Sequence, residues 1–134
     1  MKRCLALLLL SAALFAQEPT LVFQVKFLKI LMSSTSQYGV CCPDPGTRAK
    51  LESVGINVGS DWKLALASSE AEVKTLKKAG KLVIVTNAAW LGAGAGIGVV
   101  DVDGKPQIKL NAANIKASGV ALSDTIIKMG NGTQ

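Results

Sequence analysis

The sequence predicts a single α/β domain with a mostly parallel sheet core, flanking helices, and a C-terminal β-hairpin followed by a helix. Three observations lead to this prediction. Segments rich in Val, Ile and Leu alternate with segments whose apolar residues recur at helical spacing. Residues 82–86 form a continuous apolar run, which is typical of a strand buried on both faces of a parallel sheet. Asp103 and Gly104 separate two further apolar segments, and this dipeptide is a strong hairpin signal.

Residues 1–16 are predicted to be a secretory signal peptide. Lys2 and Arg3 give a positive start, and a nearly unbroken apolar run continues to Phe15. This run is shorter than the roughly 20 apolar residues that span a bilayer. We therefore expect cleavage near the end of this segment, a periplasmic location, and one domain over residues 17–134 without an integral membrane segment. The alternative is a retained N-terminal anchor.

Charge and composition limit the function classes. The chain of 134 residues has a formal net charge of +6, which becomes +4 when Lys2 and Arg3 leave with the signal peptide. The remaining lysines are scattered and are not interleaved with aromatic residues, so we expect no nucleic-acid binding. The chain contains no histidine, which removes Ser-His and Cys-His catalytic pairs and the commonest metal ligand. We therefore expect a protein that is not an enzyme and uses no cofactor or metal.

The first element of the domain is predicted to be a helix over residues 21–32. Phe23, Phe27 and Ile30 fall on one face of this helix at helical spacing. Thr20 is a suitable N-cap, because its hydroxyl oxygen can accept a hydrogen bond from the first turn.

A short strand and a second helix are expected next. Residues 38–42 read as a strand that Pro43 stops. Pro45 is suited to the first turn of a helix, so the pattern predicts a helix over residues 46–54. Gly55 follows as the terminator of this helix.

The middle of the chain alternates strand and helix. Residues 56–60 form either an edge strand or a connection, and residues 62–67 form a second core strand. Ser68 or Ser69 caps a helix over residues 70–79, whose apolar residues face inward and whose lysines face outward. The buried run at 82–86 follows.

The C-terminal third should contain a glycine-rich loop, a hairpin and a helix. Glycine occupies every second position of residues 92–98, which predicts a loop. The segments 97–102 and 107–110 form the two strands of the hairpin. A final helix is expected over residues 120–129.

The first helix is the predicted partner-binding surface. Apolar residues surround most of this helix, and only Gln24, Lys26 and Lys29 interrupt them. A helix at the surface of a small domain should show a wider polar side, so a partner, a second copy of the chain, or the glycine loop should cover the excess. The predicted partner-binding residues are Val25, Phe27, Leu28, Leu31, Trp90 and Leu91. The alternative is that the helix is buried centrally.

The glycine loop has two interpretations. A dinucleotide-binding fingerprint needs G-x-G-x-x-G before a helix, whereas this loop reads G-x-G-x-G-x-G and precedes a strand. We therefore favour a mobile loop beside the sheet, which is able to close over a partner. A second interpretation is a small-molecule site that uses this loop at the edge of the sheet. Asp101 and Asp103 form a close carboxylate pair around the predicted hairpin turn, and we expect them to be turn residues.

Cys41 and Cys42 are adjacent, so in a strand their side chains point to opposite faces. The favoured interpretation is two small buried thiols. A strained vicinal disulfide and an intermolecular disulfide remain as redox-active alternatives.

The order of these features resembles the YfiR-like family of small periplasmic proteins. The segment 96–111 (GIGVVDVDGKPQIKLN) is similar to the hairpin of that family, and 112–129 (AANIKASGVALSDTIIKM) is similar to its C-terminal end. Residues 22–29 (VFQVKFLK) resemble its first helix, and 38–45 (YGVCCPDP) its first strand and the Asp-Pro that follows. The aromatic end of the family's first helix is replaced here by Leu-Met-Ser-Ser.

The resemblance implies a function in regulation. It implies a periplasmic protein without enzymatic activity that controls a membrane-bound signalling protein, a diguanylate cyclase of cyclic-di-GMP signalling or a sensor kinase, by binding its periplasmic domain. A homodimer is a further expectation. The end of the first helix departs from the family pattern, so if the family's partner surface uses this helix, we expect the protein to bind a different partner.

Overall fold

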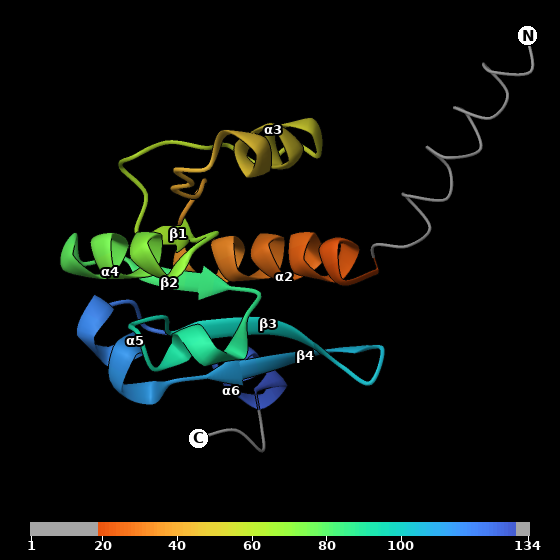
Figure 1. Cartoon of the computed structure of the whole chain (residues 1–134), viewed down its shortest axis with the longest axis vertical. Coiled ribbons are helices and arrows are strands. Elements are labelled where there is room, and N and C mark those ends of the chain that lie inside the picture. The colour runs from red at the N-terminus through yellow and green to blue at the C-terminus, as the bar shows by residue number, and fades with distance from the viewer. Residues whose placement is uncertain (1–18, 131–134) are drawn as a thin grey trace, which may run out of the picture.

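A computed structural model describes residues 19–130 and contains a four-stranded sheet with helices on both faces (Figure 1). The strands are β1 (Leu64–Leu66), β2 (Leu82–Val85), β3 (Ile97–Val102) and β4 (Lys105–Leu110), in that order across the sheet. The first three strands are parallel, and β4 pairs with β3 in the antiparallel sense. The predicted α/β class and the C-terminal hairpin are therefore confirmed. The predicted signal peptide, residues 1–16, lies outside the described residues.

Five α-helices and one 3-10 helix surround the sheet in the described range. They are α2 (Pro19–Thr35), α3 (Pro45–Ser53), α4 (Glu70–Lys78), η1 (Ala88–Leu91), α5 (Ala112–Ser118) and α6 (Asp124–Met129). The single final helix predicted over residues 120–129 is wrong, because Gly119 ends α5 in the left-handed conformation and α6 begins only at Asp124. No helix between residues 19 and 130 is long and apolar enough to cross a membrane.

Side chains that alternate along the strands divide the core into two clusters. Leu64, Ile84 and Ile97 point to one face of the sheet, where they pack with Phe27 and Leu31 of α2. The alternate strand residues Ala65, Val83 and Val85 point to the opposite face, where they form a second cluster with Val73 and Leu76 of α4. All four residues of β2 are buried, so the prediction of a strand covered on both faces is confirmed.

The helix starts follow from capping chemistry. Asp44 caps α3, because its carboxylate accepts hydrogen bonds from the backbone N–H of Thr47 at 2.9 Å and from its hydroxyl at 2.8 Å. These bonds lower the pKa of Asp44, with the backbone bond contributing most. Ser69 caps α4 in the same way, which resolves the alternative between Ser68 and Ser69.

The predicted inward face of the first helix requires a correction. Ile30 was expected to share a face with Phe27, but 44% of Ile30 is exposed, and Gln24 is 93% buried instead, with 7% exposed. The buried stripe consists of positions 24, 27, 28 and 31, which follow the i, i+3, i+4, i+7 spacing of one helix face. Ile30 lies outside this stripe, beside the exposed Lys26.

The hairpin turn has the geometry that its sequence predicts. Asp103 has a φ of 54° and Gly104 a φ of 79°, so both residues adopt the left-handed conformation that a two-residue type I′ turn requires. Strand β4 begins directly after the turn, at Lys105, two residues earlier than expected. Asp103 is therefore a turn residue, as predicted, whereas Asp101 lies in β3, where it pairs with Pro106.

Candidate functional site

The six predicted partner-binding residues do not form one surface. Phe27, Leu28 and Leu31 are at most 1% exposed and belong to the core, because they fill the space between α2 and the sheet. The structure thus places half of the predicted surface in the interior of the domain.

The other three predicted residues are only partly buried, and they are separated by the sheet. Val25 packs against the core cluster under α2, whereas Trp90 and Leu91 pack against the cluster on the α4 face. The glycine loop therefore does not cover α2. From residue 22 onward, the large apolar residues of α2 that are exposed are Val22 and Ile30, and the intervening Lys26 and Lys29 are also exposed.

The glycine loop is packed against the sheet, which corrects the expectation of a mobile loop. Ala95 is fully buried, and the side-chain amide of Asn114 donates hydrogen bonds to the carbonyl oxygens of Leu91 and Ala95, both at 2.9 Å. A Cβ atom at Gly96 would overlap the Leu82 side chain. These glycines therefore let the connection between β2 and β3 approach the sheet closely.

Cys41 and Cys42 are both free thiols, and they lie on opposite faces as expected. Cys41 is half-buried against the α4-face cluster, while Cys42 is 2% exposed in the α2-face cluster. Burial raises the pKa of the Cys42 thiol to about 11. The thiol also donates a hydrogen bond to the Asp44 carbonyl oxygen at 3.6 Å. Cys42 is thus held in its unreactive neutral form at neutral pH.

We expect Cys42 to react with iodoacetamide at least about tenfold more slowly than Cys41 at pH 8, because the buried thiol carries little thiolate and is inaccessible. The measurement is mass spectrometry of the single variants Cys41→Ser and Cys42→Ser over time. Equal rates in the folded variants would contradict the burial of Cys42.

The raised pKa of the Cys42 thiol should lower the free energy of unfolding in alkaline solution. Cys42 keeps its proton up to about pH 11 in the folded state, whereas an ordinary thiol in the unfolded chain loses its proton near pH 9. The unfolded state then binds fewer protons, so the free energy of unfolding falls between these values, by on the order of 2 kcal/mol. Urea titrations from pH 8 to 11 should show a steeper fall for the parent than for Cys42→Ala. Parallel curves would refute this assignment.

The sheet extends beyond β1 by two short parallel pairings. Cys41 pairs with Ala65 of β1, and Val40 pairs with Val58. The predicted strand over residues 38–42 is thus reduced to two bridging residues. The segment 56–60, for which an edge strand and a connection were both open, forms the outermost edge of the sheet through Val58 alone.

An aromatic pair, the exposed Tyr38 and the half-buried Trp62, lies at this edge. The rings of Tyr38 and Trp62 meet edge to face, with centroids 6.3 Å apart and planes at 78°. Tyr38 is 70% exposed, the largest exposed fraction among the bulky apolar residues described. The indole of Trp62 lies against Gly39 and Gly59, where a Cβ atom at Gly39 would overlap the ring.

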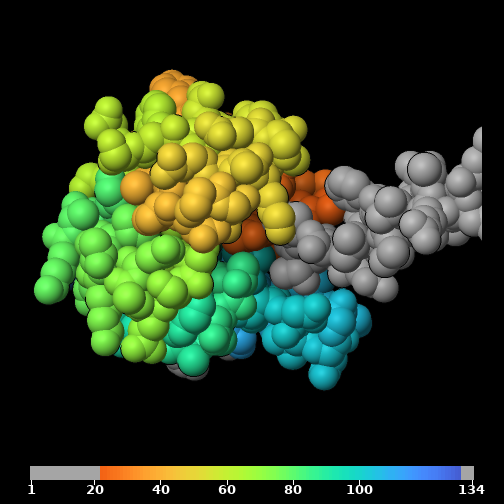
Figure 2. All heavy atoms as spheres, turned by 45° about the horizontal axis from the view of Figure 1, so that its top comes forward, coloured from red at the N-terminus to blue at the C-terminus, as the bar shows by residue number. Residues whose placement is uncertain are grey.

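A shallow hollow of about 550 Å³ adjoins this aromatic pair. Its lining residues are Glu52, Gly55, Ile56, Asn57, Val58 and Trp62. We call the surface formed by Tyr38, Glu52, Asn57, Val58 and Trp62 the aromatic edge. Figure 2 turns this end of the molecule forward, with α3 in yellow and the segment before it in orange.

The aromatic edge offers recognition chemistry. It combines two aromatic rings, one carboxylate, one amide and free main-chain groups, which suit the binding of a peptide or another polar ligand. Among residues 19–130, no cluster of three or more Asp, Glu or Cys side chains could hold a metal ion. Sequence reasoning missed this site. The available signal was that the only tyrosine begins the predicted strand 38–42 and that one of the two tryptophans, Trp62, closely follows the segment 56–60.

No family model matches this chain, and a comparison with characterised proteins finds no relative. The YfiR-like resemblance therefore stays a prediction.

Proposed function

We propose that this chain is an exported regulatory domain that works by binding a partner protein through the aromatic edge. The observation that supports this proposal most directly is the exposed Tyr38, whose ring contacts the half-buried Trp62 beside the hollow. Tyrosine and tryptophan are the residues most enriched at the energetic centres of protein interfaces, because a large rigid ring is buried at a low entropic cost.

The partner in this proposal is the periplasmic domain of a membrane-bound signalling protein, of the diguanylate cyclase or sensor kinase type. The resemblance to YfiR-like proteins supports this choice, and the lack of histidine supports a role without catalysis. In this proposal the partner-binding surface is the aromatic edge, and not the first helix that the sequence predicted.

Export is the first requirement of this function. We expect protein recovered from cells to lack residues 1–16, because the basic start and the apolar run fit a cleaved signal. Intact-mass measurement of the periplasmic fraction checks this expectation. A cytosolic species that retains Met1 would contradict the proposed location.

The binding role is tested by photo-crosslinking in the native host. The full chain carries a benzophenone amino acid in place of Tyr38, which projects from the aromatic edge. We expect a covalent adduct with a membrane signalling protein, identified by mass spectrometry. The matched control places the same group at Ile127, which is 50% exposed on α6.

Three outcomes of this experiment are informative. An adduct at Tyr38 that is missing at Ile127 supports the proposal. An adduct only with a second copy of the chain would assign the aromatic edge to a homodimer instead. Capture of no protein, together with tight binding of a metabolite, would favour a small-molecule binding protein. The packed glycine loop lends that second function no support.

A further inference from the structure

The outermost segment of the sheet has main-chain groups that face outward. The N–H of Val40 donates to the Asn57 carbonyl oxygen at 2.9 Å, and the N–H of Gly59 donates to the Val40 carbonyl oxygen at 2.9 Å. Successive residues of a strand direct these groups to opposite sides, so the N–H and C=O of Val58 point away from Val40. Within residues 19–130 neither group of Val58 forms a hydrogen bond.

The two edges of the sheet differ in how well they are protected against pairing with another strand. At the opposite edge, β4 carries Lys105, Pro106 and Lys109, and both residue types obstruct the addition of another strand. The segment 55–59 reads GINVG and contains neither lysine nor proline. Four residues of this segment, 55 to 58, line the hollow. The edge at Val58 is therefore open to a further strand.

We infer that the aromatic edge recognises an extended peptide segment of the partner by adding it as a strand beside Val58. This inference rests on the proposed binding function and specifies its mode. The main chain of the peptide pairs with the N–H and C=O of Val58, as in other cases of recognition by strand addition. One apolar side chain of the peptide enters the hollow and packs on the ring of Trp62.

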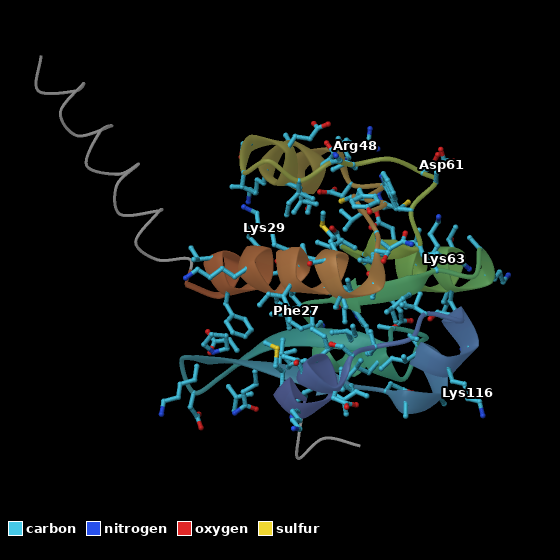
Figure 3. All side chains as sticks on the ribbon, turned by 180° about the vertical axis from the view of Figure 1, so that it is seen from behind. Phe27, Lys29, Arg48, Asp61, Lys63 and Lys116 are labelled. Carbon is cyan, nitrogen blue, oxygen red and sulfur yellow. The ribbon has the colours of Figure 1, made fainter. Side chains whose placement is uncertain are left out.

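The charges around the hollow select a basic segment. Glu52 lines the hollow, and Asp61 precedes Trp62 and projects outward from the loop before β1 (Figure 3). Both residues are exposed, and in the described range neither carboxylate forms an ion pair or a side-chain hydrogen bond. The ammonium of Lys81 donates hydrogen bonds to the carbonyl oxygens of Ser60 and Trp62, on either side of Asp61, so Glu52 is the carboxylate that faces the hollow. A lysine or arginine next to the apolar residue of the peptide would complement Glu52. The partner segment is therefore an extended peptide with one bulky apolar residue and an adjacent cation.

The decisive variant is Val58→Pro. Proline removes the outward N–H, which has no partner in the fold, and leaves the two hydrogen bonds to Val40 intact because Asn57 and Gly59 supply them. Val58→Ala is the matched control, since alanine keeps the N–H and shortens the same side chain. The thermal midpoint of each variant shows whether the domain is still folded.

The probe is a peptide selected from a phage-displayed random 12-residue library on the full domain and then synthesised. We expect the selected sequences to contain a basic residue beside a bulky apolar one. Val58→Pro should weaken peptide binding at least about tenfold and Val58→Ala less than about threefold. Amide exchange at Val58 should slow in the complex, which a merely structural effect of the variant would not cause.

Strand addition would be overturned if selection yielded no peptide, or if Val58→Pro bound the peptide as tightly as the parent. Loss of binding in Trp62→Ala alone would indicate a ligand, such as a sugar, held by the ring. Dissociation of a homodimer by Val58→Pro would make a second copy the occupant. A partner that crosslinks at Tyr38 while Val58→Pro still binds the peptide would overturn the strand but leave the proposed function standing.

Discussion

Replacing Leu28 by glutamate should unfold the domain. Leu28 is fully buried between α2 and the sheet, so the substitution places a carboxyl group among apolar side chains without a polar partner. Burial of an unpaired charge is among the few single changes that cost more than about 4 kcal/mol, which is comparable to the whole stability of a small domain. Circular dichroism should show the loss of a cooperative thermal transition.

Ile30→Glu is the matched control on the same helix. Ile30 is two residues further along and 44% exposed, so its carboxylate stays in water, and we expect the free energy of unfolding to change by less than about 0.5 kcal/mol. If both variants kept the thermal midpoint of the parent, α2 would not be part of the core. If Ile30→Glu also unfolded the protein, its exposed face would be covered in solution.

Leu28→Glu and Ile30→Glu together test which face of α2 is buried, the feature on which the sequence prediction and the structure disagree most clearly. Local patterns were sufficient to predict the helices at α2, α3 and α4, the buried strand β2 and the hairpin turn, because periodicity, caps and turn residues act over a few positions. They could not predict which side of α2 is buried. That choice depends on the sheet residues it meets, and α2 is apolar on most sides.

Local sequence patterns were also insufficient to predict the candidate site. Tyr38 and Trp62 are 24 positions apart in the sequence, and they meet only because Cys41 pairs with β1 and Val40 pairs with Val58. Each of these pairings involves one residue, so no alternating pattern marks them in the sequence. The glycine loop was misjudged for a related reason, since its glycines reflect close contact with Leu82 and Lys77 from distant elements.

Replacing Gly39, the residue next to Tyr38, by alanine should disrupt the aromatic edge. A Cβ atom at Gly39 would overlap the indole of Trp62, lie 2.6 Å from its Cε2 atom, and lie 2.8 Å from the carbonyl oxygen of Asn57. That oxygen accepts the hydrogen bond from Val40. Gly39→Ala therefore displaces the ring and strains the outer edge of the sheet together.

We expect Gly39→Ala to lower the free energy of unfolding by about 2 kcal/mol, the usual cost of overpacking, and to abolish capture of the partner at Tyr38. In a Trp90→Phe background the emission of Trp62 should move to longer wavelength as the ring becomes more exposed. Gly59→Ala is the control, because its Cβ atom would meet the same ring at an ordinary 3.4 Å. Equal stability and emission in the two alanine variants would show that the indole does not rest on Gly39, and the geometry of the aromatic edge would then be wrong.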